Sequence, residues 1–261
     1  MNINDLRFKQ KEKTSAVKLF RKAGISDLER IEEKTKLITI MSLARVISQY
    51  TNHEGVNIYD EYEKFYKKVE LYAKTYFIQH KIDKFNIKSC ESAISNIYQS
   101  LTTSRKPQEY VGILVEYFLL RLVKNKSNKV RHECKIYYKR KSLQSNNVKI
   151  KDKVLDLIRI HKKNKIDLFE CKANLHSEFK ALSVGKNGRL KYKLKLMEHL
   201  NQTLKQCQSN LYAGFTEIES YLVTVVKPMN QVDLTDRFSR NIKVIAFEDL
   251  ITNELQNKKL Y

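Results

Sequence analysis

The sequence has few of the residues that mark linkers, metal-binding cysteine clusters or membrane spans. Its 261 residues include two prolines and six glycines and form no repeat or low-complexity tract, so no flexible linker is evident. No apolar run is long enough to span a membrane, and the first residues lack the hydrophobic core of a signal peptide. The cysteines show no paired metal-ligand spacing, which is typical of reduced, buried thiols in an intracellular protein. They are Cys90, Cys134, Cys171 and Cys207.

What the sequence has in excess is positive charge. Its 50 lysines and arginines oppose 29 aspartates and glutamates, which leaves a formal net charge of +21. An excess of this size favours a polyanionic partner, and nucleic acid fits better than an anionic membrane surface. A lysine-rich proteome would produce the same balance without such a partner, and that alternative stays open.

Residues 1–103 are expected to be helical. A capping-box pattern at Ser26–Glu29 precedes apolar residues at helical spacing as far as Ile47, and an aromatic stripe runs between Tyr59 and Gln79. Such stripes are typical of helices that pack against one another. We therefore expect a small bundle that recognises the target, dimerises the chain or contacts a partner.

Residues 104–261 alternate between strand and helix patterns. Residues 107–123 are apolar nearly all round, which predicts a buried helix with Pro107 in its first turn. Strands are expected at 130–138, 154–160, 165–172, 221–226 and 242–247, with helices at 191–210 and 248–255. This order predicts an α/β (α+β) fold in which helices flank a mixed central sheet.

Three charged residues interrupt the two apolar strands at 154–172, which a short polar turn joins into a hairpin. They are Asp156, Glu170 and Lys172. Side chains alternate along a strand, so Glu170 and Lys172 share a face and Cys171 points to the other. Two carboxylates and a lysine gathered there are costly to desolvate, and a bound metal ion would offset that cost. The hairpin therefore predicts a metal-dependent phosphodiesterase site.

Asp167 is nearer to Glu170 in sequence than Asp156 is. An odd number of positions separates Asp167 from Glu170 on one strand, so the two side chains should face opposite sides. The turn instead brings Asp156 alongside Glu170. We prefer Asp156, and a β-bulge that rotates Asp167 back is the alternative.

Glu116 stands in the middle of the apolar helix. A buried, unpaired carboxylate there is costly or becomes neutral. One interpretation is that Glu116 pairs with a lysine or lies at a solvated edge, and the other is that it faces the same metal as the hairpin acids. The peptide carbonyl of Cys171 is a further candidate ligand.

Phosphodiester hydrolysis needs an activated water and a way to hold negative charge, and carboxylate-bound divalent ions supply both. Lys172 would orient or deprotonate the attacking water. Basic segments on either side of the hairpin predict contacts with a phosphate backbone, although a solvated face is the common alternative. The residues that we assign to nucleic-acid binding are Lys180, Lys186, Arg189, Lys191 and Lys193.

These residues resemble the pattern of the PD-(D/E)XK nuclease superfamily, which has the restriction-endonuclease-like fold. That pattern is a helix with a glutamate, a strand with an aspartate and a strand with Glu-x-Lys, which Glu116, Asp156 and Glu170–Lys172 match. The resemblance covers about residues 107–250, and Leu155 stands where the family has a proline. It implies an endonuclease that acts on duplex DNA with Mg²⁺, or Mn²⁺ as a substitute, in restriction or antiviral defence in a prokaryotic cytoplasm.

Two other functions stay open. One is a catalytically inactive nucleic-acid-binding module of the same fold, whose acids pair with lysines. The other is a nuclease directed at RNA. A cut in both strands of DNA needs two active sites or two visits, so a homodimer or a partner subunit is one expected arrangement.

Overall fold

The computed structural model describes residues 6–10, 25–50, 61–82, 85–103, 107–123, 128–138, 140–161, 165–172, 175, 188–209, 217–225 and 241–255. The chain divides into two compact units. The sheet unit comprises Met1–Glu12 and Val123–Ile245, and the helical unit comprises Lys13–Leu122 and Ala246–Tyr261. The two units interleave along the sequence, whereas the sequence pattern predicted a single boundary between residues 103 and 104.

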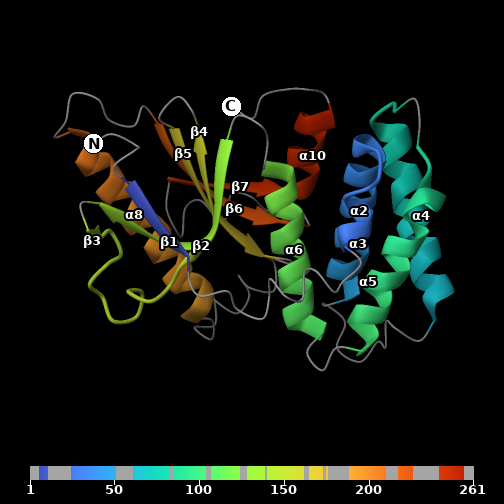
Figure 1. Ribbon diagram of the computed structural model, residues 1–261, viewed down its shortest axis with the longest axis horizontal. Helices are drawn as coiled ribbons and strands as arrows, with labels where there is room; N and C mark the ends of the chain where they lie inside the picture. The colour runs from blue at the N-terminus through green and yellow to red at the C-terminus, as the bar shows by residue number, and fades with distance from the viewer. Residues whose placement is uncertain are drawn as a thin grey trace. The chain divides into compact units, whose positions relative to one another are not determined.

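A mixed sheet forms the core of the sheet unit. In space its strands follow the order β1, β2, β4, β5, β6 and β7, and β3 pairs with β2 (Figure 1). The expected mixed sheet in an α/β (α+β) fold is thereby confirmed. The strands are β1 (Leu6–Gln10), β2 (Asn128–Tyr138), β3 (Lys141–Ser142), β4 (Leu155–His161), β5 (Lys165–Lys172), β6 (Glu217–Thr224) and β7 (Ile242–Ala246).

The strand β1 corrects the expectation that residues 1–103 are all helical. Its apolar residues Leu6 and Phe8 alternate with the exposed Arg7 and Lys9, and this period of two is that of a half-buried strand. It pairs antiparallel with β2, and Leu6 and Phe8 pack into the core of the sheet unit. A five-residue strand was too short for the sequence to reveal beside long helical patterns.

The central strands change direction once. The strands β2, β4 and β5 pair antiparallel, whereas β5 and β6 pair parallel. Parallel neighbours need a crossover connection, and the helix α8 (Gly188–Ser209) lies between them in sequence. Buried apolar side chains of α8 join the core cluster of the sheet: Leu190, Leu194, Leu196, Met197, Leu200 and Leu204. The helix α8 therefore covers one face of the sheet.

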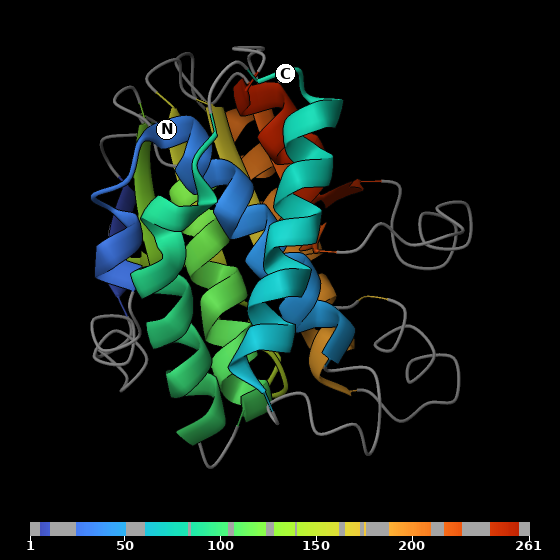
Figure 2. The ribbon, with the colours of Figure 1, turned by 90° about the vertical axis from the view of Figure 1, so that its right-hand side faces the viewer.

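The helical unit contains α2 (Ile25–Leu28), α3 (Glu33–Tyr50), α4 (Tyr62–Gln79), η2 (Ile87–Cys90), α5 (Glu91–Thr103), α6 (Pro107–Val123) and α10 (Phe247–Leu255). Figure 2 shows α3, α4 and α5 running alongside one another. The helix α6 belongs to this unit, where Arg121 Nη2 lies 3.1 Å from Glu29 Oε2 and Tyr117 donates a hydrogen bond to Glu29. The N-terminus of α3 is capped by Glu32, whose carboxylate accepts from the amides of Lys34 and Thr35.

Two further expectations from composition can be compared with the described residues. Cys90, Cys134 and Cys171 are buried thiols that form no disulfide with one another, as expected. The side chain of Cys207 lies outside the described set. Within the ranges that the structure describes, no helix is long and apolar enough to cross a membrane.

The packing of α8 on the sheet makes a stability prediction. Leu200 is 1% exposed in the core cluster, so Leu200→Ala should lower the free energy of unfolding by roughly 2–5 kcal/mol through lost burial and a residual cavity. The exposed Lys205 lies on the same helix, and Lys205→Ala should change it by less than about 0.5 kcal/mol. Urea unfolding followed by circular dichroism measures both. Equal effects of the two substitutions would mean that α8 does not pack as described.

Candidate functional site

The structure brings Asp156, Glu170 and Lys172 together on the covered face of the sheet. Leu157 pairs with Phe169 across β4 and β5, so one further step along the same register sets Asp156 opposite Glu170. The side chains are largely withdrawn from water, since Asp156 is 5% exposed and Glu170 is 0% exposed. The catalytic role of these residues stays a prediction.

A fourth side chain, Lys193 of α8, completes the cluster. Its Nζ lies 3.1 Å from Asp156 Oδ1 and 2.8 Å from Glu170 Oε2, so one ammonium bridges the two carboxylates. Lys172 Nζ donates to Glu170 Oε1 at 2.8 Å, and the amide of Cys171 donates to Asp156 Oδ2 at 2.7 Å. All four carboxylate oxygens therefore accept a hydrogen bond.

The β2–β4 ladder is interrupted beside Asp156, and the β4–β5 ladder ends one residue short of it, at Leu157 and Phe169. The pairs between β2 and β4 pass from His132 with Leu157 to Cys134 with Leu155, and the intervening Glu133 has a φ of 44°. This left-handed conformation costs on the order of 1–3 kcal/mol for a residue with a side chain, and such strain is typical of functional sites. On the other side, the amide of Cys171 bonds to the carboxylate of Asp156.

Burial and charge act in opposite directions on these groups. Burial raises the pKa of the Asp156 carboxyl, but the charges of Lys193 and Lys172 outweigh it and leave the pKa below its ordinary value. Burial raises the pKa of Glu170, and the charge of Asp156 adds to that rise. Burial lowers the pKa of Lys172 and of Lys193, but the two carboxylates outweigh it and raise both values. Both lysines are therefore cationic at neutral pH.

The chemistry of this donor set fits a hard divalent cation. Asp156 and Glu170 already hold one cation between them, because the ammonium of Lys193 contacts one oxygen of each. Mg²⁺ is commonly held by one or two carboxylates, with water and substrate phosphate completing its shell. Among the described residues no group of three or more His, Cys, Asp or Glu side chains gathers as a ready-made metal cage. A metal here would use Asp156, Glu170 and the Cys171 carbonyl. In this structure the ammonium of Lys193 contacts the two carboxylates.

The other residues from the sequence analysis are distributed as follows. Glu116 lies on α6 in the helical unit, where it is half-buried and has a polar interaction, so its assignment as a metal ligand stays a prediction. Arg189 lies in the first turn of α8, and Lys191 is exposed on the same helix. Lys180 and Lys186 lie outside the described residues. Lys193 was expected to bind phosphate, and its contact with the two acids was not predicted from the sequence.

Asp167 faces the other side of the sheet, as the alternation of side chains predicted. It pairs with Arg159 across the β4–β5 register without a bulge, so the bulge alternative is wrong. Arg159 Nε and His161 Nε2 lie 2.7 Å and 2.6 Å from Asp167 Oδ2. Asp167 is fully buried, and these contacts give it a structural partner set that is separate from Asp156 and Glu170.

A second set of ionic contacts surrounds Glu219 on β6. Lys165 Nζ lies 2.6 Å from Glu219 Oε2, and Lys243 and the Tyr221 hydroxyl also donate to this carboxylate. Burial raises the pKa of Glu219, but these three hydrogen bonds outweigh it and lower the pKa to about 2. The ionised form of Glu219 therefore contributes to stability.

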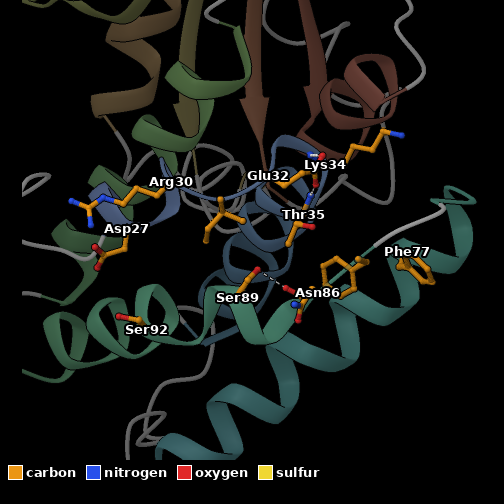
Figure 3. A pocket seen from close by; sticks show the side chains of 11 residues that line it. Asp27, Arg30, Glu32, Lys34, Thr35, Phe77, Asn86, Ser89 and Ser92 are labelled. Carbon is orange, nitrogen blue, oxygen red and sulfur yellow. Dashed lines mark hydrogen bonds between the residues drawn. The ribbon is translucent and has the colours of Figure 1, made fainter.

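A concavity of about 1090 Å³ lies within the helical unit and holds none of the predicted site residues. Its acids are satisfied internally, since Glu32 caps α3 and Asp27 accepts from Asn96. Figure 3 shows Arg30 and Lys34 pointing away from each other, so they do not converge on one anion. The lining residues are Asp27, Arg30, Ile31, Glu32, Lys34, Thr35, Phe77, Phe85, Asn86, Ser89 and Ser92.

Comparison with known proteins leaves the family of this chain open. No protein-family model and no curated protein matches it. Among solved structures, the crystal structure of protein VC1899 from Vibrio cholerae matches with a TM-score of 0.33 and 15% sequence identity. The match covers 98% of this chain and 59% of that chain. A similarity of this size gives no argument for a shared fold or function.

The contacts of Glu219 make stability depend on pH. The pKa of Glu219 is about 2 in the folded protein against an ordinary value of 4.5, so its contribution is complete above about pH 5 and is lost as the pH falls toward 2. Glu219→Gln should therefore lower stability most above pH 5, and the difference from the wild type should shrink under acid. Urea midpoints measured between pH 7 and pH 3 test this. A difference that stays constant over that range would contradict the assignment.

Proposed function

We propose that the protein is a Mg²⁺-dependent endonuclease that hydrolyses phosphodiester bonds of DNA, with restriction or antiviral defence as its setting. The observation that carries the proposal is the pair of buried carboxylates, Asp156 and Glu170. Both contact the ammonium of Lys193, and Glu170 also contacts Lys172. A buried ion pair of this kind contributes little to stability, because desolvation opposes the attraction between the charges. Its presence therefore suggests a functional role. Binding a metal ion is a use that matches its chemistry.

Each residue has a role that follows from its contacts. Asp156 and Glu170 would hold the metal with the Cys171 carbonyl. The metal, when bound, supplies an activated water and charge stabilisation at the phosphate. Lys172 is cationic beside Glu170, so it would orient the attacking water and neutralise charge on the phosphate.

The excess positive charge supports a nucleic-acid substrate. The net charge of +21 suits a polymer with one charge on every phosphate, and Lys191 on α8 is exposed two residues from Lys193. Arg189, Lys180 and Lys186 belong to the same basic stretch of sequence. Duplex DNA is the substrate that the resemblance to PD-(D/E)XK nucleases suggests, and a homodimer would cut both strands.

The direct test is a cleavage assay with Mg²⁺ on plasmid, linear duplex and single-stranded DNA. Asp156→Asn and Lys172→Ala should each slow cleavage by about 100-fold or more, because each removes a group that acts on the reacting phosphate. The control is Lys88→Ala, which removes the same charge as Lys172→Ala from an exposed position in the helical unit and should cleave at the wild-type rate. Wild-type rates for both site variants would refute the proposal.

A second candidate function is a nucleic-acid-binding module without catalysis. The observation that favours it is that protein donors satisfy all four oxygens of Asp156 and Glu170. On this alternative, binding would be insensitive to EDTA, and neither Mg²⁺ nor Mn²⁺ would support cleavage. Offering RNA and DNA at matched salt separates either function from an RNA-directed one.

A further inference from the structure

We propose that Lys193 is an exchangeable cation of the candidate site, which holds Asp156 and Glu170 together until a metal ion displaces it. This inference rests on the proposed function, because it takes the ligand that displaces Lys193 to be a divalent metal. The ammonium contacts Asp156 Oδ1 and Glu170 Oε2, which are oxygens that a shared metal would also use. Lys193 and the metal cannot both occupy that position, so their binding is mutually exclusive.

The two carboxylates need a cation when no metal is bound. Both are buried, and without Lys193 the ionic partner that remains among the described residues is Lys172, which forms its ion pair with Glu170. Two buried negative charges with one positive charge leave a carboxylate unpaired, and breaking a buried pair in this way is strongly destabilising. Lys193 therefore stabilises the site while no metal is bound.

The position of Lys193 allows it to leave. Its neighbours Leu194 and Met197 pack in the core, which holds α8 against the sheet. The side chain of Lys193 is 19% exposed, whereas that of Glu170 has no exposure, so part of the Lys193 side chain reaches solvent. A flexible four-carbon stem lets the ammonium swing outward while the helix stays in place.

The displaced ammonium would lie where a phosphate enters. Lys191, two residues before Lys193 on α8, is exposed, and the freed Lys193 would add a second cation to the same end of the helix. Metal binding would then convert Lys193 from a partner of carboxylates into a partner of phosphate. Metal and nucleic acid would each favour the binding of the other.

The first test measures Mn²⁺ binding by titration calorimetry in the wild type and in Lys193→Met, which keeps the length of the side chain without its charge. Lys193→Met should bind Mn²⁺ about tenfold more tightly or better. In the wild type, only the molecules in which Lys193 has left the carboxylates can bind the metal, and this lowers the apparent affinity. The metal-free variant should also melt below the wild type and regain stability with Mn²⁺. Unchanged or weaker Mn²⁺ affinity would overturn the proposal.

A second test uses the wild type alone and so does not depend on the variant folding. Reductive methylation followed by mass spectrometry reports how readily each lysine reacts. Mg²⁺ should raise the reactivity of Lys193 several-fold by releasing it and leave that of the exposed Lys191 unchanged. Reactivity of Lys193 that Mg²⁺ leaves unchanged or lowers would overturn the exchange.

The outcomes separate this inference from the proposed function. Tighter Mn²⁺ binding by Lys193→Met without any DNA cleavage by the wild type would support the exchange and refute the nuclease. Cleavage by the wild type with unchanged Mn²⁺ affinity in Lys193→Met would support the nuclease and refute the exchange.

Discussion

The contact on which the candidate site depends is the ammonium of Lys193 between Asp156 and Glu170. Antiparallel pairing of β4 and β5 sets the two carboxylates opposite each other, where like charges repel and burial removes the screening of water. A cation between them turns this repulsion into attraction on both sides. The buried pair is therefore more stable while a cation, ammonium or metal, lies between the two carboxylates.

The topology of the sheet places Lys193 beside the two acids. The change from antiparallel to parallel pairing at β5 requires a crossover, and α8 supplies it with an apolar side that packs on the sheet. Packing fixes the helix, and Lys193 then reaches the acids from a different element than the one that carries them. An arrangement in which acids and cation come from separate elements can open by moving one side chain, without unpairing a strand.

Strong periodic signals predicted much of the fold. The bounds of β5 and α6 agree with the sequence because long apolar runs leave few alternatives. The start of α3 did not follow the capping box near Ser26, because Glu32 caps the helix instead. Alternation along β5 separated Asp156 from Asp167, since that rule is local. The role of Lys193 could not be predicted, because several lysines precede and follow it and only the crossover decides which one meets the acids.

The two faces of the β4–β5 hairpin show what distinguishes a structural ion pair from one that can exchange. Asp167 is held by Arg159 from the neighbouring strand, and a guanidinium in that position is rigid, permanently charged and 5% exposed. Asp156 is held by a lysine with a flexible stem, and this lysine side chain is partly exposed. Both oxygens of Asp156 accept a hydrogen bond, whereas Asp167 accepts through Oδ2 and its Oδ1 has no hydrogen-bond partner among the described residues. The cation beside Asp156 is the one that can be replaced without unpairing a strand. Chemistry on this hairpin is therefore expected on the face of Asp156.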